Sequence, residues 1–285
     1  MPPVALALLL AAALMHAGWN LLVKRAAEQQ IFTWWALLVG AVCLLPLVIV
    51  NLPLPPRVWP YIADSAALEA LYFLALTHGY AIADFSLIYP IGRGAAPIFL
   101  AIWAPFFLGE KPHPGGLFGL ALLILGLLVV GSAGLWTWRW RAALNLPGIV
   151  AALAVALCIS GYTVIDGKAV RFVNPLPYAI LVLGCAGVLT TPIVLLRYGR
   201  PAVLREWRVD WPRIVLVALL SLGTYAIVLY VYTVARVGYA GSIREVSIVF
   251  AAVAGWRFLG ERFGAVRTVG AVLIFCGILS IAILG

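Results

Sequence analysis

Charged residues are scarce in this chain of 285 residues. Only 10% of them are Asp, Glu, Lys or Arg, whereas 65% are hydrophobic, and the mean hydropathy is +1.10. A typical soluble domain is about a quarter charged, and a helix that spans a bilayer needs about 20 predominantly apolar residues. The composition therefore excludes an ordinary soluble domain and predicts an all-α integral membrane protein.

Motifs for catalysis and for metal binding are missing as well. The chain has no G-x-S-x-G, H-E-x-x-H or G-x-x-x-x-G-K-[ST] pattern, so it carries no known hydrolase, metalloprotease or nucleotide-binding signature. Its four cysteines stand singly in apolar runs, without a C-x-x-C pair or a histidine at ligand spacing. We predict no enzymatic activity, no cofactor and no metal site.

Acidic residues are fewer than basic ones, and the net charge is +9. The basic residues lie in the short segments between apolar runs and do not form a continuous basic stripe. This distribution is typical of the loops of a membrane protein and not of a nucleic-acid-binding surface. Most Lys and Arg residues lie in the odd-numbered loops of the predicted span order. The positive-inside rule then places both termini of a multi-pass inner (plasma) membrane protein on the non-cytoplasmic side.

Ten apolar stretches are long enough to be spans, and helices are expected because backbone polar groups in lipid need internal partners. They cover residues 3–23, 31–50, 59–79, 85–108, 115–134, 146–167, 175–197, 212–235, 240–259 and 265–284. The first stretch lacks the basic segment of a signal peptide, so we interpret it as a spanning helix.

The sequence repeats itself at an offset of 151 residues, where "FFLGEK" (106–111) aligns with "RFLGER" (257–262). Arg93 then aligns with Arg244, and Gly119 and Gly126 align with Gly270 and Gly277. We expect two units, 1–145 and 146–285, of five helices each. Because each unit crosses the membrane an odd number of times, the two copies have opposite orientations. Such inverted repeats are typical of secondary transporters.

The order and spacing of three segments resemble the drug/metabolite transporter superfamily, specifically its ten-helix EamA-type transporters. The segments are "HAGWNLLVK" (16–24), "DFSLIYPIGRGAAP" (84–97) followed by "LGEK" (108–111), and "GYAGSIREVSIVFAAVAGWRFLGERF" (238–263). The resemblance covers nearly the whole chain. It implies ten helices, no prosthetic group, and export or exchange of small metabolites, with amino acids as the substrates of its best-known bacterial branch.

Arg93 is the most informative single residue, because an arginine at mid-depth is costly and needs water, a counter-charge or exposed carbonyls. Three interpretations stay open: a permanent pair with Glu69 or Glu245, an attraction for an anionic substrate group, or extension to the interface. Since helix neighbours point about 100° apart, Arg244 and Glu245 are expected to have different partners. Pro90 and Pro97 predict a bend around Arg93, whereas the second copy should stay regular.

Polar and aromatic residues predicted to lie inside the helix bundle make up the candidate substrate site. They are His16, Trp19, Asn20, Tyr72, Tyr89, Arg93, Tyr162, Tyr225, Arg244 and Glu245. The candidates for proton coupling are Glu69, His78 and Asp166, because such groups can titrate on alternating exposure. Glu110 and Glu261, which end the repeated "LGE" motif, are instead predicted to cap helix N-termini.

These features predict a secondary transporter with a small-molecule substrate, working in the bilayer by alternating access around a midplane cavity. We expect it to export amino acids, aromatic or otherwise neutral, as a monomer without a nucleic-acid partner. Efflux of drugs or hydrophobic cations is the alternative within transport, and it would need an unpaired carboxylate in the membrane. A structural or regulatory membrane protein without transport activity is the alternative of another class.

Overall fold

The computed structural model describes residues 1–82, 85–111, 113–132, 146–250 and 265–284. In this part of the chain the protein consists of helices and their connections. The helices are α1 (Pro3–Lys24), α2 (Gln29–Val50), the short 3₁₀ helix η1 (Pro56–Val58), α3 (Trp59–Ile82), α4 (Phe85–Trp103), the π-helical turn η2 (Ala104–Leu108), α5 (Pro114–Ser132), α6 (Leu146–Ala169), α7 (Pro175–Val234), α8 (Val237–Arg244) and α10 (Ala265–Leu284).

Several helices in the described ranges are long and apolar enough to cross a membrane. These segments are Pro3–Val23, Gln29–Val50, Ile91–Leu108, Leu146–Ala169 and Pro175–Val234, and two shorter apolar helices cover Pro114–Val129 and Thr268–Leu284. The apolar stretches predicted from the sequence lie on helices as far as each is described. The exception is 240–259, whose described part leaves α-helical geometry after Arg244.

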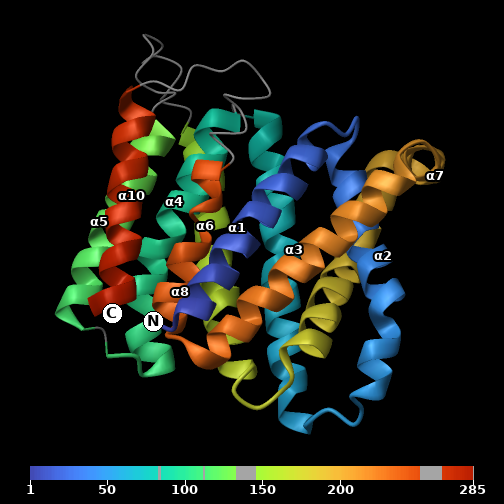
Figure 1. Ribbon diagram of the computed structural model, residues 1–285. Helices are drawn as coiled ribbons and strands as arrows, with labels where there is room; N and C mark the ends of the chain where they lie inside the picture. The colour runs from blue at the N-terminus through green and yellow to red at the C-terminus, as the bar shows by residue number, and fades with distance from the viewer. Residues whose placement is uncertain (83–84, 112, 133–145, 251–264, 285) are drawn as a thin grey trace.

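Helix α7 is too long for a single crossing. Its 60 residues would extend roughly 90 Å if straight, about three times the hydrocarbon thickness. Gly199 interrupts it with φ 74° and ψ 158°, a conformation that favours glycine, and the chain turns back there (Figure 1). The two legs of α7 contain the stretches 175–197 and 212–235 that the sequence predicts as separate spans.

Both ends of the chain lie at the same end of the bundle (Figure 1). The amino group of Met1 donates a hydrogen bond to the carbonyl oxygen of Ala282 at 3.0 Å. We call this end of the bundle the terminal side. The connection between α1 and α2 and the reversal at Gly199 lie at the opposite end, which we call the distal side.

Helices α5 and α10 pack side by side through glycines (Figure 1). A Cβ atom built on Gly119 would lie 2.8 Å from the carbonyl oxygen of Gly277, and one on Gly126 would lie 2.7 Å from that of Gly270. Small residues allow such backbone contact between membrane helices. In the sequence repeat Gly119 aligns with Gly270, and Gly126 aligns with Gly277. In the structure the pairs are exchanged, because Gly119 packs against Gly277 and Gly126 packs against Gly270.

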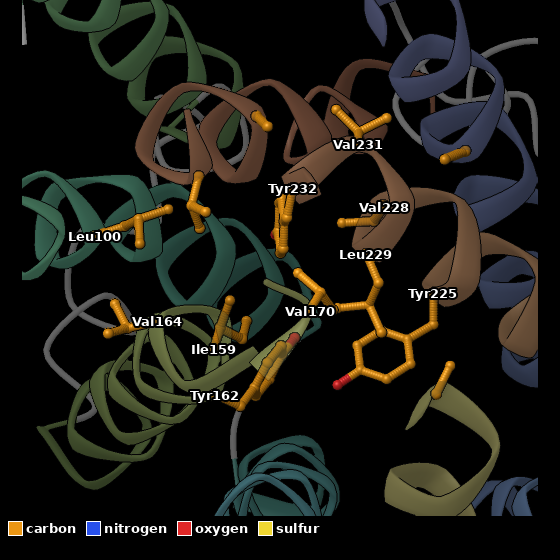
Figure 2. Close-up of a cluster of buried hydrophobic side chains, with 14 of the residues drawn as sticks. Leu100, Ile159, Tyr162, Val164, Val170, Tyr225, Val228, Leu229, Val231 and Tyr232 are labelled. Atoms are coloured by element: carbon orange, nitrogen blue, oxygen red, sulfur yellow. The ribbon is translucent and has the colours of Figure 1, made fainter. Parts of the chain in front are cut away.

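The other main helix pairs are α2 with α7, α4 with α6, and α3 with α6. Figure 2 shows part of the buried cluster, to which α7 contributes Val228 and Leu229 and α6 contributes Ile159. Tyr162 of α6 and Tyr225 of α7 border the same cluster. This core surrounds the polar groups described next.

Candidate functional site

Arg93 of α4 forms an ion pair with Glu245, the residue that follows the last turn of α8. Arg93 Nη1 donates to Glu245 Oε2 at 2.9 Å, and the two residues expose only 3% and 1% of their surface. Arg244 binds the other oxygen of the same carboxylate, with Nε at 3.0 Å and Nη2 at 2.9 Å from Oε1. Of the interpretations open for Arg93, the structure shows a pair with an intramembrane acid.

Two expectations about this region are wrong. Arg244 and Glu245 contact each other, and the second copy does not stay regular after Arg244. After Arg244 the backbone follows i→i+3 bonds, from the Glu245 amide to Ser242 and from the Val246 amide to Ile243, so the 100° rule for α-helical neighbours no longer applies.

Helix α4 is α-helical from Phe85 to Trp103 and continues into the π-helical turn η2, and the bend expected around Arg93 stays a prediction. Gly92 lets it pack closely on α6, because a Cβ there would lie 2.9 Å from Val155 Cγ1. Prolines are tolerated in membrane helices where neighbouring helices hold the backbone in place.

The two guanidinium groups have further partners around this carboxylate. Arg93 Nη2 donates to the Tyr72 hydroxyl at 3.2 Å, and Arg244 Nη2 donates to Thr163 Oγ1 at 3.4 Å. The Arg244 guanidinium also lies 5.7 Å from the centre of the Tyr162 ring, within the range of a cation–π interaction. Since arginine stays protonated in proteins, two guanidinium groups share the carboxylate of Glu245 here.

A cavity borders this cluster. It contains about 60 Å³ into which the centre of a water molecule fits, several times the roughly 10–15 Å³ that one water requires. Its walls are formed by His16, Trp19, Thr33, Ala36, Leu37, Glu69, Tyr72, Phe73, Arg93, Tyr162, Leu183, Val217, Ser221, Thr224, Tyr225, Val228 and Arg244.

The cavity lies in the middle of the bundle. Trp19 in the second half of α1 and Thr33 near the start of α2 border it from the distal side. Leu183 near the start of α7 and Tyr162 in the second half of α6 border it from the terminal side.

Asp166 of α6 lies behind the cavity wall, fully buried, and its carboxylate accepts three hydrogen bonds from hydroxyl groups. Oδ1 accepts from Ser65 at 2.6 Å and from Tyr178 at 2.8 Å, and Oδ2 accepts from Tyr225 at 2.6 Å. These partners come from α3 and from both legs of α7. Both oxygens are thus occupied, and the carboxylate ties together helices of the first and second sequence repeats.

Glu69 of α3 differs from these acids. It is 4% exposed and lines the cavity, but among the described residues its carboxyl has no hydrogen bond or ion pair. Two ring nitrogens from α1, His16 Nε2 and Trp19 Nε1, are also buried without a partner in the same part of the chain. The cavity is therefore bordered by unsatisfied polar groups as well as by aromatic rings.

The predicted site residues fall into three groups. His16, Trp19, Tyr72, Arg93, Tyr162, Tyr225 and Arg244 line the cavity, and Glu245 supports the two arginines from behind. Asn20 donates instead to the carbonyl of His16 in its own helix at 2.7 Å. The side chain of Tyr89 lies outside the described residues. The roles assigned to all of these residues remain predictions.

Of the three proton-coupling candidates, Glu69 lines the cavity and Asp166 lies next to its wall, whereas His78 is exposed on α3. Sequence reasoning missed several wall residues. Along α7, Val217, Ser221, Thr224 and Val228 follow the helical period of Tyr225. That period could have identified them, whereas nothing in the sequence marks Thr33 or Phe73.

Glu110 caps a helix, although not the one that follows it in sequence. Its carboxylate accepts from the amides of Val237 at 2.6 Å and Gly238 at 3.0 Å, at the N-terminus of α8. A carboxylate there satisfies free amides and interacts favourably with the helix dipole. The loop of the first repeat thus holds the helix that ends at Arg244, while Glu261 lies outside the described residues.

No group of three or more potential metal-ligating side chains occurs in the ranges that the structure covers. A family model described as the EamA-like transporter family matches residues 3–132 and again residues 146–283. One solved crystal structure, described only as that of a protein, superposes with a TM-score of 0.76 at 17% sequence identity, covering 100% of this chain and 99% of its own. No curated protein sequence matches the chain.

Proposed function

Because the chain belongs to the EamA-like transporter family, whose members are transporters and not enzymes, we propose that it exports neutral amino acids, preferentially aromatic ones, by alternating access. Family membership makes it a secondary transporter with a small-molecule substrate, embedded in a membrane through its apolar helices. Beyond family membership, we propose the direction of transport and the class of substrate.

The architecture we propose is ten transmembrane helices in two inverted five-helix repeats, residues 1–145 and 146–285. The crossed contacts of Gly119 with Gly277 and of Gly126 with Gly270 support it, because an in-plane twofold axis exchanges each residue with its counterpart. Arg93 and Arg244, which also align in the repeat, bind the two oxygens of one carboxylate. Both observations are what two antiparallel copies around a central axis would produce.

Two guanidinium groups in the wall of one cavity, Arg93 and Arg244, carry the substrate assignment. A substrate carboxylate would complement them, since charge-assisted bonds from guanidinium to carboxylate are strong and directional. The remaining wall is aromatic and apolar, with Trp19, Tyr72, Phe73 and Tyr162 among its members. Such a wall suits a flat or aliphatic side chain.

Efflux of hydrophobic cations is the second candidate, and Glu69 is the observation that favours it. An unpaired carboxyl in an aromatic cavity would suit a cation. Against this candidate stand two guanidinium groups in the wall of the same cavity, which would repel a solute that is only positive.

Counterflow into proteoliposomes tests the proposal. Vesicles preloaded with unlabelled phenylalanine should accumulate labelled phenylalanine and leucine, whereas vesicles preloaded with tetraphenylphosphonium should not accumulate that cation. Arg93→Ala should abolish amino-acid counterflow, and Arg205→Ala, at an exposed position on α7, should leave it unchanged. Counterflow of the cation without any amino acid would reject the proposal in favour of the second candidate.

A further inference from the structure

Glu69 presents a buried carboxyl to the cavity without a donor from the described chain. Its residue is 4% exposed, and it belongs to the cavity wall together with Arg93 and Arg244. Among the described residues, the fully enclosed polar atoms that lack a partner do not include its oxygens, so the carboxyl reaches the space of the cavity. A donor for Glu69 can therefore come from a solute in the cavity.

The other acids of this region show how different Glu69 is. Glu245 receives bonds from Arg93 and Arg244, and Asp166 receives three from hydroxyl groups. Glu110 receives two backbone amides. Each oxygen of those carboxylates already accepts a hydrogen bond from the protein, which is not so for Glu69 within the described residues.

Glu69 is also placed correctly relative to the positive charges. It lies three residues before Tyr72 on α3, so the two side chains share one face of the helix and are one turn apart. The Tyr72 hydroxyl accepts a bond from Arg93. Glu69 and the guanidinium group of Arg93 therefore both border the cavity beside Tyr72.

We propose that Glu69 accepts the α-ammonium group of the substrate while the Arg93 and Arg244 side of the cavity holds its α-carboxylate. The transported class is then the zwitterionic α-amino acids, and a solute with only one of the two charges lacks half of the site. This inference rests on the proposed function. It also explains why one cavity contains features of both an anion site and a cation site.

A series of analogues tests the inference on the wild-type protein. Unlabelled phenylalanine, 3-phenylpropionate and phenethylamine are compared as competitors of labelled phenylalanine in counterflow; the second lacks the ammonium group and the third lacks the carboxylate. Sites built to bond a polar group discriminate strongly against analogues that lack it, so each half-analogue should compete at least roughly tenfold less well than phenylalanine. Equal competition by 3-phenylpropionate would overturn the assignment of Glu69.

Glu69→Gln adds a second, independent readout. The variant should lose phenylalanine counterflow by at least roughly tenfold and should discriminate less against 3-phenylpropionate, because the amide no longer attracts an ammonium group. A merely structural role would not relax that discrimination. Glu206→Gln is the matched control, since Glu206 is also a buried glutamate with an unpartnered oxygen but lies outside the cavity wall.

The outcomes separate the two proposals. If the wild type carries no amino acid, the proposed function is wrong, whatever Glu69 does. If the wild type carries phenylalanine and Glu69→Gln carries it equally well, the inference is wrong and the proposed function stands. Size-exclusion chromatography shows whether the variant is folded, and the analogue series in the wild type decides the matter if it is not.

Discussion

Arg93 and Glu245 lie 152 positions apart in sequence, yet they form a buried ion pair of 2.9 Å. The pair joins α4 of the first repeat to the end of α8 in the second. Arg244, the repeat counterpart of Arg93, binds the same carboxylate. One carboxylate therefore binds guanidinium groups from both halves of the molecule.

Glu245→Gln should destabilise the protein strongly. It leaves two buried guanidinium groups without a counter-charge, and breaking a buried pair costs about 3–5 kcal/mol. The thermal unfolding temperature in detergent, followed by tryptophan fluorescence, measures the effect. Arg93→Met is the comparison: it should cost less, because Arg244 still neutralises Glu245. An equal loss in the two variants would contradict this account of the cluster.

Gly126→Ala should weaken the contact between α5 and α10. The added Cβ would lie 2.7 Å from the carbonyl oxygen of Gly270, so a backbone must move, and overpacking typically costs about 1–3 kcal/mol. Gly18→Ala is the matched control in α1, where a Cβ meets nothing within 4 Å. It should leave stability unchanged or raise it slightly, because alanine is the better helix former. Similar unfolding temperatures for both variants would show that the close glycine contact is unimportant.

Tyr225→Phe removes one of the three hydroxyl donors to Asp166. The buried Oδ2 then has no donor from this cluster, which should lower the free energy of unfolding by about 1–3 kcal/mol. Tyr230→Phe, at a position that is 51% exposed, removes a hydroxyl from the same helix and should have almost no effect. Chemical denaturation in detergent compares the two. If Tyr225→Phe were as stable as Tyr230→Phe, Asp166 would not depend on this bond.

Glu110→Ala should loosen the N-terminus of α8. It removes the acceptor of the Val237 and Gly238 amides, and loss of an N-terminal cap costs about 0.5–2 kcal/mol. Because α8 carries Arg244 at its last position, we also expect weaker amino-acid counterflow. Hydrogen exchange at the amides of Val237 and Gly238 should accelerate in the variant. Unchanged exchange there would mean that the cap does not hold this helix end.

The positions of the helices along the chain could be predicted from the sequence, whereas most contacts between the helices could not. The apolar stretches correspond to helices as far as they are described, because in lipid the hydrogen bonds of the backbone leave few alternatives. The pairing of Arg244 with Glu245 was missed because it depends on a turn that no motif in the sequence marks.

In the candidate site, too, the sequence identified individual residues but not their contacts. Arg93, Arg244, Tyr162 and Glu69 could be identified from the sequence because polar groups in an apolar helix are costly and therefore conspicuous. Which of them are satisfied by the protein could not be identified. Asp166 and Glu69 look alike in the sequence, yet one carboxylate accepts three hydroxyls and the other faces the cavity with no partner in the described chain.

The sequence by itself determined the membrane environment, the helical class, the internal repeat and the residues whose charge needs an explanation. These properties depend on composition and on spacing along one chain, and both can be read without coordinates. Only the tertiary structure decided which charges neutralise each other and which remain available to a solute. Whether two charged groups pair depends on contacts between helices that lie far apart in the sequence. A difference of a few tenths of an ångström in such a contact determines whether the hydrogen bond forms.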